Sequence, residues 1–233
     1  MPRTHCRFAG FRVRTDRRIC CAYRLETAPY SISIGVGMLK RTLKAILSGA
    51  SLVVSFPPAA VSAFGRWTAM YEFFTHIYAL IPGIVPGDYL RVAYYKLTLA
   101  ECSLSSRISF GSFFSHPEAR VGPQVYIGSY CIIGTASIGE RTQIACGVQI
   151  LSGRHQHRRD VEGGLAGAAE GVFSTIAIGA DCWIGAGAIV MADVGAGSTI
   201  GAGSVVSRPI AEHSVAVGNP ARVIKQGVDV AGA

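Results

Sequence analysis

The chain has 233 residues, of which 50% are hydrophobic, 15% are charged and 28 are glycine. This composition excludes a disordered chain and suits a globular protein with one large core. The formal net charge of +8 lies in the first 44 residues, which hold ten basic and two acidic side chains, while the other 189 residues carry twelve of each sign. A neutral body argues against a nucleic-acid partner, whose phosphates would require a basic folded surface.

The N-terminal part divides into two predicted segments. Residues 1–37 are rich in Arg, Cys and Gly and show no helical or strand period, so we expect a disordered basic leader. The basic stretch MLKRTLK (38–44) then precedes an uncharged apolar run at 46–65. That run is long enough to span a membrane, but it contains Pro57-Pro58 and several serines. Three interpretations stay open: a membrane-associated or half-inserted helix pair, a helix packed on the core, or a cleaved signal peptide.

Two further helices are expected before the chain changes character. Residues 67–81 place apolar side chains at helical spacing and end at Pro82-Gly83, and a second short helix is predicted over 88–101. We therefore assign 38–107 to a helical, partly membrane-like N-terminal segment.

From about residue 108 the sequence repeats. An aliphatic residue, often followed by glycine, recurs every six residues, with a few shorter or longer steps. The aliphatic positions are Val121, Ile127, Ile133, Ile138, Ile144, Ile150, Ile178, Ile184, Val190, Val194, Ile200 and Val206. A small residue follows four positions later in most repeats. A six-residue unit suits one short strand plus a tight corner, in which the aliphatic points inward and the adjacent glycine tolerates the backbone angles of the corner.

Three such units make one triangular coil, and stacked coils form a prism of parallel sheets. A single coil cannot bury its own inward face, so several must stack, and the repeats supply about five coils. The predicted fold class is therefore mainly β, a parallel β-helix over 108–225, with residues 226–233 as a tail.

The seven cysteines form no CxxC pair and no zinc-type spacing, which predicts a reducing compartment and no disulfide framework. One segment breaks the repeat, ILSGRHQHRRD at 150–160, with two histidines fenced by arginines. The coil resumes only at Ile176. An excursion this long from a tight solenoid is typical of a functional loop.

The repeat region resembles the hexapeptide-repeat acyltransferase family. The resemblance rests on CWIGAGAIV (182–190), IGAGSVV (200–206) and VGNPARVIK (217–225), and it covers about half of the chain. It implies a left-handed parallel β-helix, a handedness that periodicity alone does not give. IPGIVPGDYLRVAYYKLTL (81–99) and FGSFFSHP (110–117) look like a subgroup associated with polysaccharide and lipopolysaccharide O-acetylation.

The resemblance also implies a catalytic residue. Galactoside- and maltose-type acetyltransferases of the family carry a catalytic histidine on an extended loop, seventeen residues after an Ile-Gly pair. Counting from Ile138 leads to His155, which would act as the general base. His157 and Arg158 on the same loop, and Trp183, would contribute to the acceptor pocket.

The implied cofactor is acetyl-CoA, as acyl donor, with no metal. Family members often have serine after WIG, whereas this chain has Ala186, so only a backbone N–H is available there to stabilise an oxyanion. Ala202 and Ser207 match positions that contact the pantetheine arm. Arg208, Arg222 and Lys225 match basic positions near the nucleotide phosphates.

The expected function is acetyl transfer to a sugar or glycan hydroxyl in cell-surface polysaccharide or lipopolysaccharide synthesis. A serine or xenobiotic acetyltransferase and a non-catalytic membrane-held scaffold remain alternatives. A zinc enzyme of the γ-carbonic-anhydrase type is disfavoured, because two histidines two residues apart point to opposite sides of an extended segment. The family implies a homotrimer with sites between chains. We expect a cytoplasmic protein that contacts the inner-membrane surface through 38–65.

Overall fold

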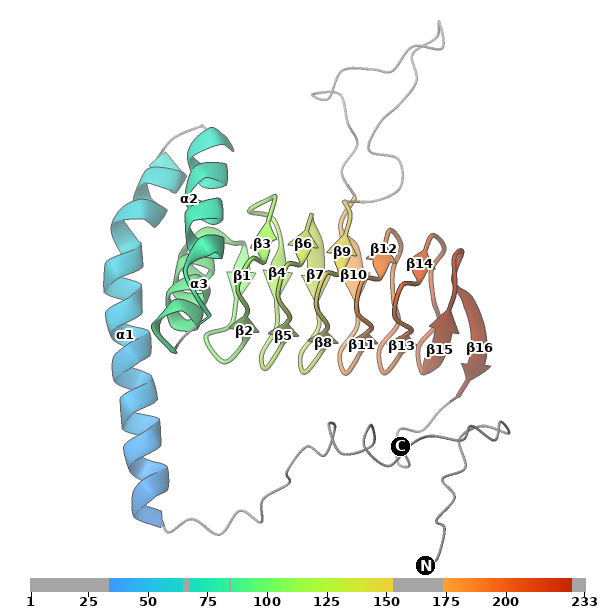
Figure 1. Ribbon diagram of the computed structural model, residues 1–233, viewed down its shortest axis with the longest axis horizontal. Coiled ribbons are helices and arrows are strands. Elements are labelled where there is room, and N and C mark those ends of the chain that lie inside the picture. The colour runs from blue at the N-terminus through green and yellow to red at the C-terminus, as the bar shows by residue number, and fades with distance from the viewer. Residues whose placement is uncertain (1–33, 65–67, 84, 153–173, 228–233) are drawn as a thin grey trace, which may run out of the picture. The chain divides into compact units, whose positions relative to one another are not determined.

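The computed structural model describes residues 34–64, 68–83, 85–152 and 174–227 (Figure 1). The chain divides into two units, Met1–Lys40 and Arg41–Ala233. Helix α1 (Ile34–Phe64) begins in the first unit and continues into the second, where α2 (Thr68–Leu80) and α3 (Val85–Thr98) follow. Short β-strands make up most of the rest of the second unit, so the described part is mainly β with a helical N-terminal region, as predicted.

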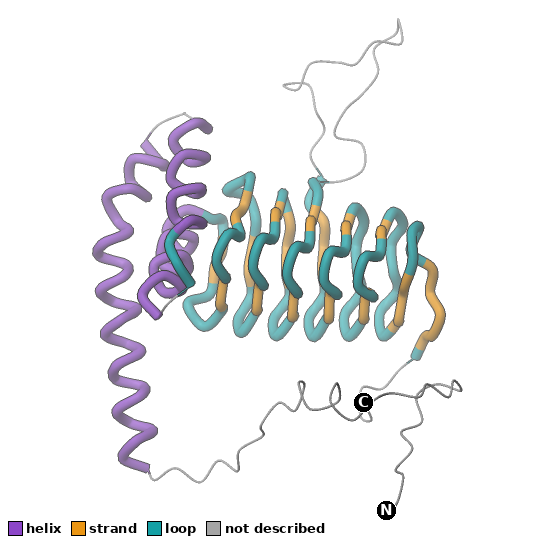
Figure 2. The backbone as a smooth tube through the Cα atoms, viewed as in Figure 1, coloured by secondary structure: helices purple, strands orange, loops and turns teal. Residues whose placement is uncertain are grey.

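The strands form three sheets, which are the faces of a prism (Figures 1 and 2). Face 1 contains β1 (Glu101–Cys102), β4 (Arg120–Val121), β7 (Ala136–Ile138) and β10 (Ile176–Ile178). Face 2 contains β2 (Arg107–Ile108), β5 (Tyr126–Ile127), β8 (Gln143–Ile144), β11 (Trp183–Ile184), β13 (Thr199–Ile200), β15 (Ser214–Val217) and β16 (Arg222–Gln226). Face 3 contains β3 (Phe113–Phe114), β6 (Ile132–Ile133), β9 (Gln149–Ile150), β12 (Ile189–Val190) and β14 (Val205–Val206).

Each coil visits the three faces in turn, and every strand pairs with the equivalent strand of the next coil. The pairing is parallel throughout, except that β16 turns back antiparallel to β15 and closes the C-terminal end. The inward side chain of each strand is an aliphatic in nearly every coil, and it is buried against the same position one coil away, as with Ile144 and Ile184. The repeat therefore folds into the predicted β-helix of about five coils.

The irregular steps of the repeat all fall at one corner. From face 1 to face 2 and from face 2 to face 3, successive inward residues are six apart in every coil. From face 3 back to face 1 the step varies: five from Ile133 to Ile138, four from Val190 to Val194, and the long insertion after Ile150. The corner between faces 3 and 1 is thus the place where the prism tolerates a change of length.

The structure corrects the role predicted for the glycine after each aliphatic. The corner residue in the left-handed region lies two positions further on, as at Arg141 (φ 59°) and Gly187 (φ 67°). The glycine beside the aliphatic is needed because the next coil passes very close. A Cβ on Gly185 would lie 2.5 Å from the Ala202 nitrogen. This glycine sets how tightly the coils stack.

The small residue four positions after the aliphatic is buried, and several of these residues also hydrogen bond between coils. The Thr142 hydroxyl donates to the Gly179 carbonyl (2.8 Å) and accepts from the Cys182 N–H (3.1 Å). Cys131 and Cys182 fill the equivalent space, and burial raises the pKa of both thiols. These cysteines are packing residues and stay protonated at neutral pH.

The prism begins at Glu101, about seven residues before the repeat is visible in the sequence. Cys102, Ile108 and Phe114 are the inward residues of this first coil and are fully buried. Helix α3 packs against it through Arg91, whose buried guanidinium donates from Nε to the Ile108 carbonyl (2.9 Å) and pairs with Asp88. A buried cation with its donors satisfied joins the helices to the prism.

Helix α1 runs unbroken through Pro57 and Pro58 to Phe64, so the described part of the segment at 38–65 is one helix and not the helix pair considered from the sequence. Within the described residues, the stretch Lys40–Ala63 is long and apolar enough to cross a membrane, with a mean hydropathy of 1.5. Its second half contacts α3, where the Ser62 hydroxyl lies 3.2 Å from the Tyr94 hydroxyl.

The stacking of inward aliphatics can be tested on one strand. Ile144→Ala should lower the free energy of unfolding by about 2–5 kcal/mol, because it leaves a cavity between coils that cannot collapse. Gln143→Ala, on the exposed side of the same strand, is the matched control and should change stability by less than about 0.5 kcal/mol. Denaturant unfolding measures both, and equal losses would contradict an inward-facing Ile144.

Candidate active site

The insertion that carries the histidines leaves the prism through a closed neck. Its two ends meet where the Ser174 N–H donates to the Ser152 carbonyl (2.9 Å). The Ser152 hydroxyl is buried and accepts from the Thr135 N–H (2.8 Å), and the Ile176 N–H donates to the Thr135 carbonyl (3.0 Å). Both ends of the loop are therefore anchored to the preceding coil at the corner between faces 3 and 1. His155, His157 and Arg158 lie outside the described residues.

An acidic residue that the sequence reasoning missed stands one coil beyond this neck. The Asp193 carboxylate accepts a hydrogen bond from the Ala177 N–H (2.8 Å), on the strand to which the loop returns. Asp193 lies in the four-residue step between Val190 and Val194. That shortened step was the signal that could have identified it, because it brings a polar side chain across the corner toward the preceding coil.

The corner between faces 2 and 3 carries two of the predicted cofactor contacts. Ala186 and Ala202 occupy equivalent positions in adjacent coils, and the Gly203 N–H donates to the Ala186 carbonyl (2.8 Å). Both alanines are exposed, and Gly187 and Gly203 face open space. Among the described residues, the Ala186 N–H has no hydrogen-bond acceptor. This exposed edge, hereafter the alanine edge, offers backbone donors and room for an extended ligand.

Trp183 lies on face 2, beside the alanine edge, and its side chain is 59% exposed. Its neighbour Ile184 is the inward residue of the same strand, so the indole points away from the core. The register of face 2 places Gln143 on one side of Trp183 and Thr199 on the other. The tryptophan is therefore a surface side chain and not a core-packing residue.

The predicted basic residues divide between two places. Arg222 and Lys225 lie on β16, at the C-terminal end of face 2, and Lys225 pairs in register with Val215. Ser207 and Arg208 follow β14 at the corner between faces 3 and 1. The guanidinium or ammonium groups of Arg208, Arg222 and Lys225 are exposed and have no carboxylate partner within the described ranges. They remain available to an anionic ligand.

Within the described residues, the predicted site residues and the ends of the histidine loop fall into two groups. The alanine edge, Trp183 and Arg222 lie along one side of the prism, near the corner between faces 2 and 3. The neck of the histidine loop and Arg208 lie at the other edge of face 3. The width of face 3 separates the two groups within the described residues.

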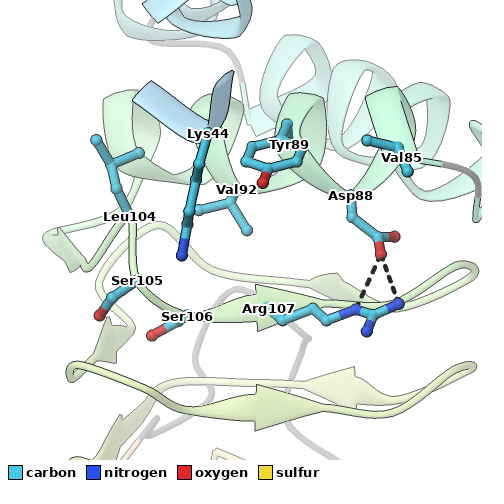
Figure 3. Close-up of a pocket in the computed structure, with 9 residues that line it drawn as sticks. All are labelled: Lys44, Val85, Asp88, Tyr89, Val92, Leu104, Ser105, Ser106 and Arg107. Atoms are coloured by element: carbon cyan, nitrogen blue, oxygen red, sulfur yellow. Dashed lines mark hydrogen bonds and ion pairs between the residues drawn. The ribbon is translucent and has the colours of Figure 1, made fainter. Parts of the chain in front are cut away.

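A cavity of about 400 Å³ lies at the helical end, between α1, α3 and the first coil (Figure 3). Lys44 points into it, and the Asp88 carboxylate is held by Arg91 and by the Arg107 Nε (2.9 Å). None of the residues predicted for catalysis or cofactor binding lines this cavity. Its one carboxylate is fully engaged in ion pairs, which leaves no general base in it.

In the part of the chain that the structure describes, no group of three or more His, Cys, Asp or Glu side chains is placed to hold a metal ion. The buried Cys102 thiol is unsuited to ligation, because burial raises its pKa to about 12. Cys146 is the exposed thiol among the four described cysteines.

No protein-family profile matches the sequence. Curated relatives do: the chain is 35% identical over 136 residues to serine acetyltransferase 2 of Arabidopsis thaliana, a match that covers 54% of this chain and 37% of that protein. It is 44% identical over 109 residues to nodulation protein L of Rhizobium leguminosarum bv. viciae, covering 45% of this chain and 55% of that protein. The chain thus spans about half or less of the length of these relatives.

Among solved structures, a hexapeptide-repeat-containing acetyltransferase from Vibrio cholerae matches with a TM-score of 0.59 and 19% identity. The match covers 70% of this chain and 92% of that one. At this level of identity the likeness concerns the fold.

Proposed function

We propose that this chain, whose repeat region belongs to the hexapeptide-repeat acyltransferase family, transfers an acetyl group from acetyl-CoA to a sugar hydroxyl in cell-surface polysaccharide or lipopolysaccharide synthesis. The observation that carries the proposal is the pairing of two features on one prism. A long loop containing His155 is anchored at one corner, and an exposed alanine edge with unpaired N–H donors runs along another.

In the proposed reaction, the neutral imidazole of His155 accepts the proton of the acceptor hydroxyl as its oxygen attacks the thioester carbonyl. A general base of this kind contributes about 10²–10⁴-fold in rate. The tetrahedral oxyanion accepts a hydrogen bond from the Ala186 N–H, which has no other partner among the described residues. Collapse of the intermediate expels the CoA thiolate, which takes the proton back from His155 and leaves as the thiol.

The cofactor would lie along the alanine edge. Ala202 leaves room there for a pantetheine arm, since neither it nor Gly203 is covered by other side chains. Ser207 is assigned to the same arm by resemblance. Arg222 and Lys225 would contact the nucleotide phosphates from the same chain, and Arg208, which lies across face 3, would do so from a neighbouring chain.

The proposed assembly is a homotrimer, because the loop neck and the alanine edge lie at opposite edges of face 3 within one chain. A neighbouring chain could bring its alanine edge to this loop. The outer side of face 3 favours such contact: Phe113, Ile132, Ile189 and Val205 follow one another in register, with Gln149 as the polar member of the column. A closed three-fold ring would complete three equivalent sites. His157, Arg158 and Trp183 would then line the acceptor pocket.

A second function, acetylation of serine, is favoured by one observation: the 35% identity to a serine acetyltransferase over 136 residues. Both functions would use His155 as the base and acetyl-CoA as the acetyl donor, and they differ only in whether a sugar or serine accepts the acetyl group. Assays with acetyl-CoA against free serine and against hexoses and nucleotide sugars distinguish them by the acceptor that releases free CoA thiol. Release with neither acceptor class would favour the scaffold alternative.

Because acetyl-CoA is a cytoplasmic metabolite, the proposal places the prism in the cytoplasm. The buried, protonated thiols of Cys102, Cys131 and Cys182 suit such a reducing compartment, since they form no disulfide within the described residues.

The role of His155 can be tested with a matched pair of variants. His155→Asn should lower kcat about 10²–10⁴-fold with little change in the KM for acetyl-CoA, because it removes the general base. His213→Asn, an exposed histidine at a regular corner, is the control and should retain full activity. In the wild type, kcat/KM should fall as the pH drops below about 6.5, where an unperturbed imidazole is protonated. A His155→Asn variant that keeps wild-type turnover would refute the role of His155 as general base.

If Arg222 and Lys225 contact the phosphates of acetyl-CoA, their substitution should change the affinity for acetyl-CoA alone. Arg222→Gln and Lys225→Gln should each raise the KM for acetyl-CoA about tenfold, or ~1.4 kcal/mol, and leave kcat unchanged. Arg120→Gln, an exposed cation on face 1, should change neither parameter. Steady-state kinetics with varied acetyl-CoA measure the effect. Variants that raised only the KM of the acceptor would place these cations elsewhere in the site.

A further inference from the structure

Helix α1 has its polarity reversed relative to a helix of a water-soluble protein. The buried residues of α1 are small and mostly polar, namely Ser51, Ser55 and Ala59, and the half-buried positions beside them include Ser48, Leu52 and Ser62. The exposed side carries large apolar residues: Leu43, Ile46, Val53, Val54, Phe56 and Val61. Val54 is 62% exposed, whereas Ser55 next to it is fully buried.

Helix α2 also exposes large apolar residues. Its buried residues include Tyr71, Thr75 and Tyr78, and the Thr75 hydroxyl lies 2.6 Å from the Tyr95 hydroxyl of α3. Its exposed residues include Phe73, Ile77 and Leu80. The interior between the helices is thus lined by hydroxyl groups as well as aromatic rings, while several large apolar side chains of both helices face outward.

Such an arrangement is unfavourable in water. A surface helix normally buries its apolar stripe, and exposed apolar patches beyond a few hundred Å² mark an interaction surface. Small and hydroxyl-bearing residues between helices, with large aliphatics outside, are the pattern of helices surrounded by lipid. Three cations, Lys40, Arg41 and Lys44, lie within five residues at the N-terminal part of α1 and are exposed. Basic residues at this position suit anionic lipid headgroups.

We propose that the outward faces of α1 and α2 form a docking surface for an anionic lipid bilayer, and that both helices lie in the plane of the membrane. This inference is independent of the proposed reaction. The apolar residues would enter one leaflet, and Lys40 and Arg41 would contact the headgroups, whereas Lys44 points into the cavity beside α3.

The contacts of α1 with the prism argue for an in-plane helix and against a membrane-spanning one. Near its start, Lys44 lines a cavity with α3 and the first coil, and near its end, Ser62 contacts Tyr94 of α3. Soluble structure therefore lies along the same side of α1 over most of its length in the second unit. A helix crossing the bilayer in this arrangement would draw the exposed Arg107 of the first coil into hydrocarbon, which is costly.

Flotation of the full-length protein with lipid vesicles tests the docking surface. The wild type should float with vesicles of phosphatidylcholine and phosphatidylglycerol, and less with phosphatidylcholine alone. Val54→Glu and Phe73→Glu should each reduce the bound fraction at least tenfold, because they place a charge in the apolar face. Ile224→Glu, at a 65% exposed apolar residue on β16, is the matched control and should float like the wild type. Far-UV circular dichroism confirms that the exposed substitutions leave the fold intact.

Labelling of introduced cysteines separates the in-plane helix from a spanning one. In Ala45→Cys and Ala63→Cys proteins bound to sealed vesicles, a membrane-impermeant maleimide should reach both ends of the helix from the outside, as resolved by peptide mass spectrometry. Labelling of only one end would show that α1 crosses the membrane and would overturn the in-plane arrangement.

Equal flotation of the wild type and both glutamate variants would exclude these faces from lipid contact. No flotation of the wild type, together with a smaller oligomer in the glutamate variants, would identify the face as a contact between copies of the chain.

Discussion

The stacking of inward aliphatic side chains, one coil upon the next, is the constraint on which the rest of the structure depends. One coil has too few residues to bury its own inward face, so Ile144 is shielded only because Ile127 and Ile184 occupy the same position in the adjacent coils. The glycine beside the aliphatic makes this contact close, since any Cβ there would strike the backbone of the next coil. Close stacking keeps the corners aligned, and aligned corners create a straight edge on which an extended cofactor can lie.

The three corners are not equivalent, and this difference places the two halves of the proposed site. Two corners repeat with six-residue spacing and a left-handed residue at a fixed position. The third varies in length, so it accepts a long insertion without disturbing the register of the inward residues. The histidine loop leaves the prism there, while the regular corner between faces 2 and 3 forms the alanine edge. This separation is the reason for proposing a site shared by neighbouring chains.

Much of the prism could be predicted from the repeat. Each inward residue is recognised by its position within the six-residue unit, which usually holds an aliphatic side chain. The buried state of Ile150 or Val206 therefore needed no tertiary information. The start at Glu101 was not predictable, since the first coil uses Cys102 and Phe114 as inward residues and α3 supplies its cover. The role predicted for the glycine after each aliphatic was wrong, because the sequence of one repeat does not show how close the next coil passes. The exposed side of α1 was equally hidden, as hydropathy identifies an apolar helix but not which face contacts the protein.

The central claim is that a complete site needs the loop of one chain and the alanine edge of another. Mixed trimers test it directly. His155→Asn removes the base, and Ala202→Trp fills the exposed edge without entering the core, so each variant alone should be inactive. Randomly assembled three-fold rings of the two variants should regain about a quarter of the wild-type activity, because some sites combine an intact loop with an intact edge from the neighbouring chain. If the mixed rings remain inactive while the homotrimers stay folded, the site lies within one chain and the account is contradicted.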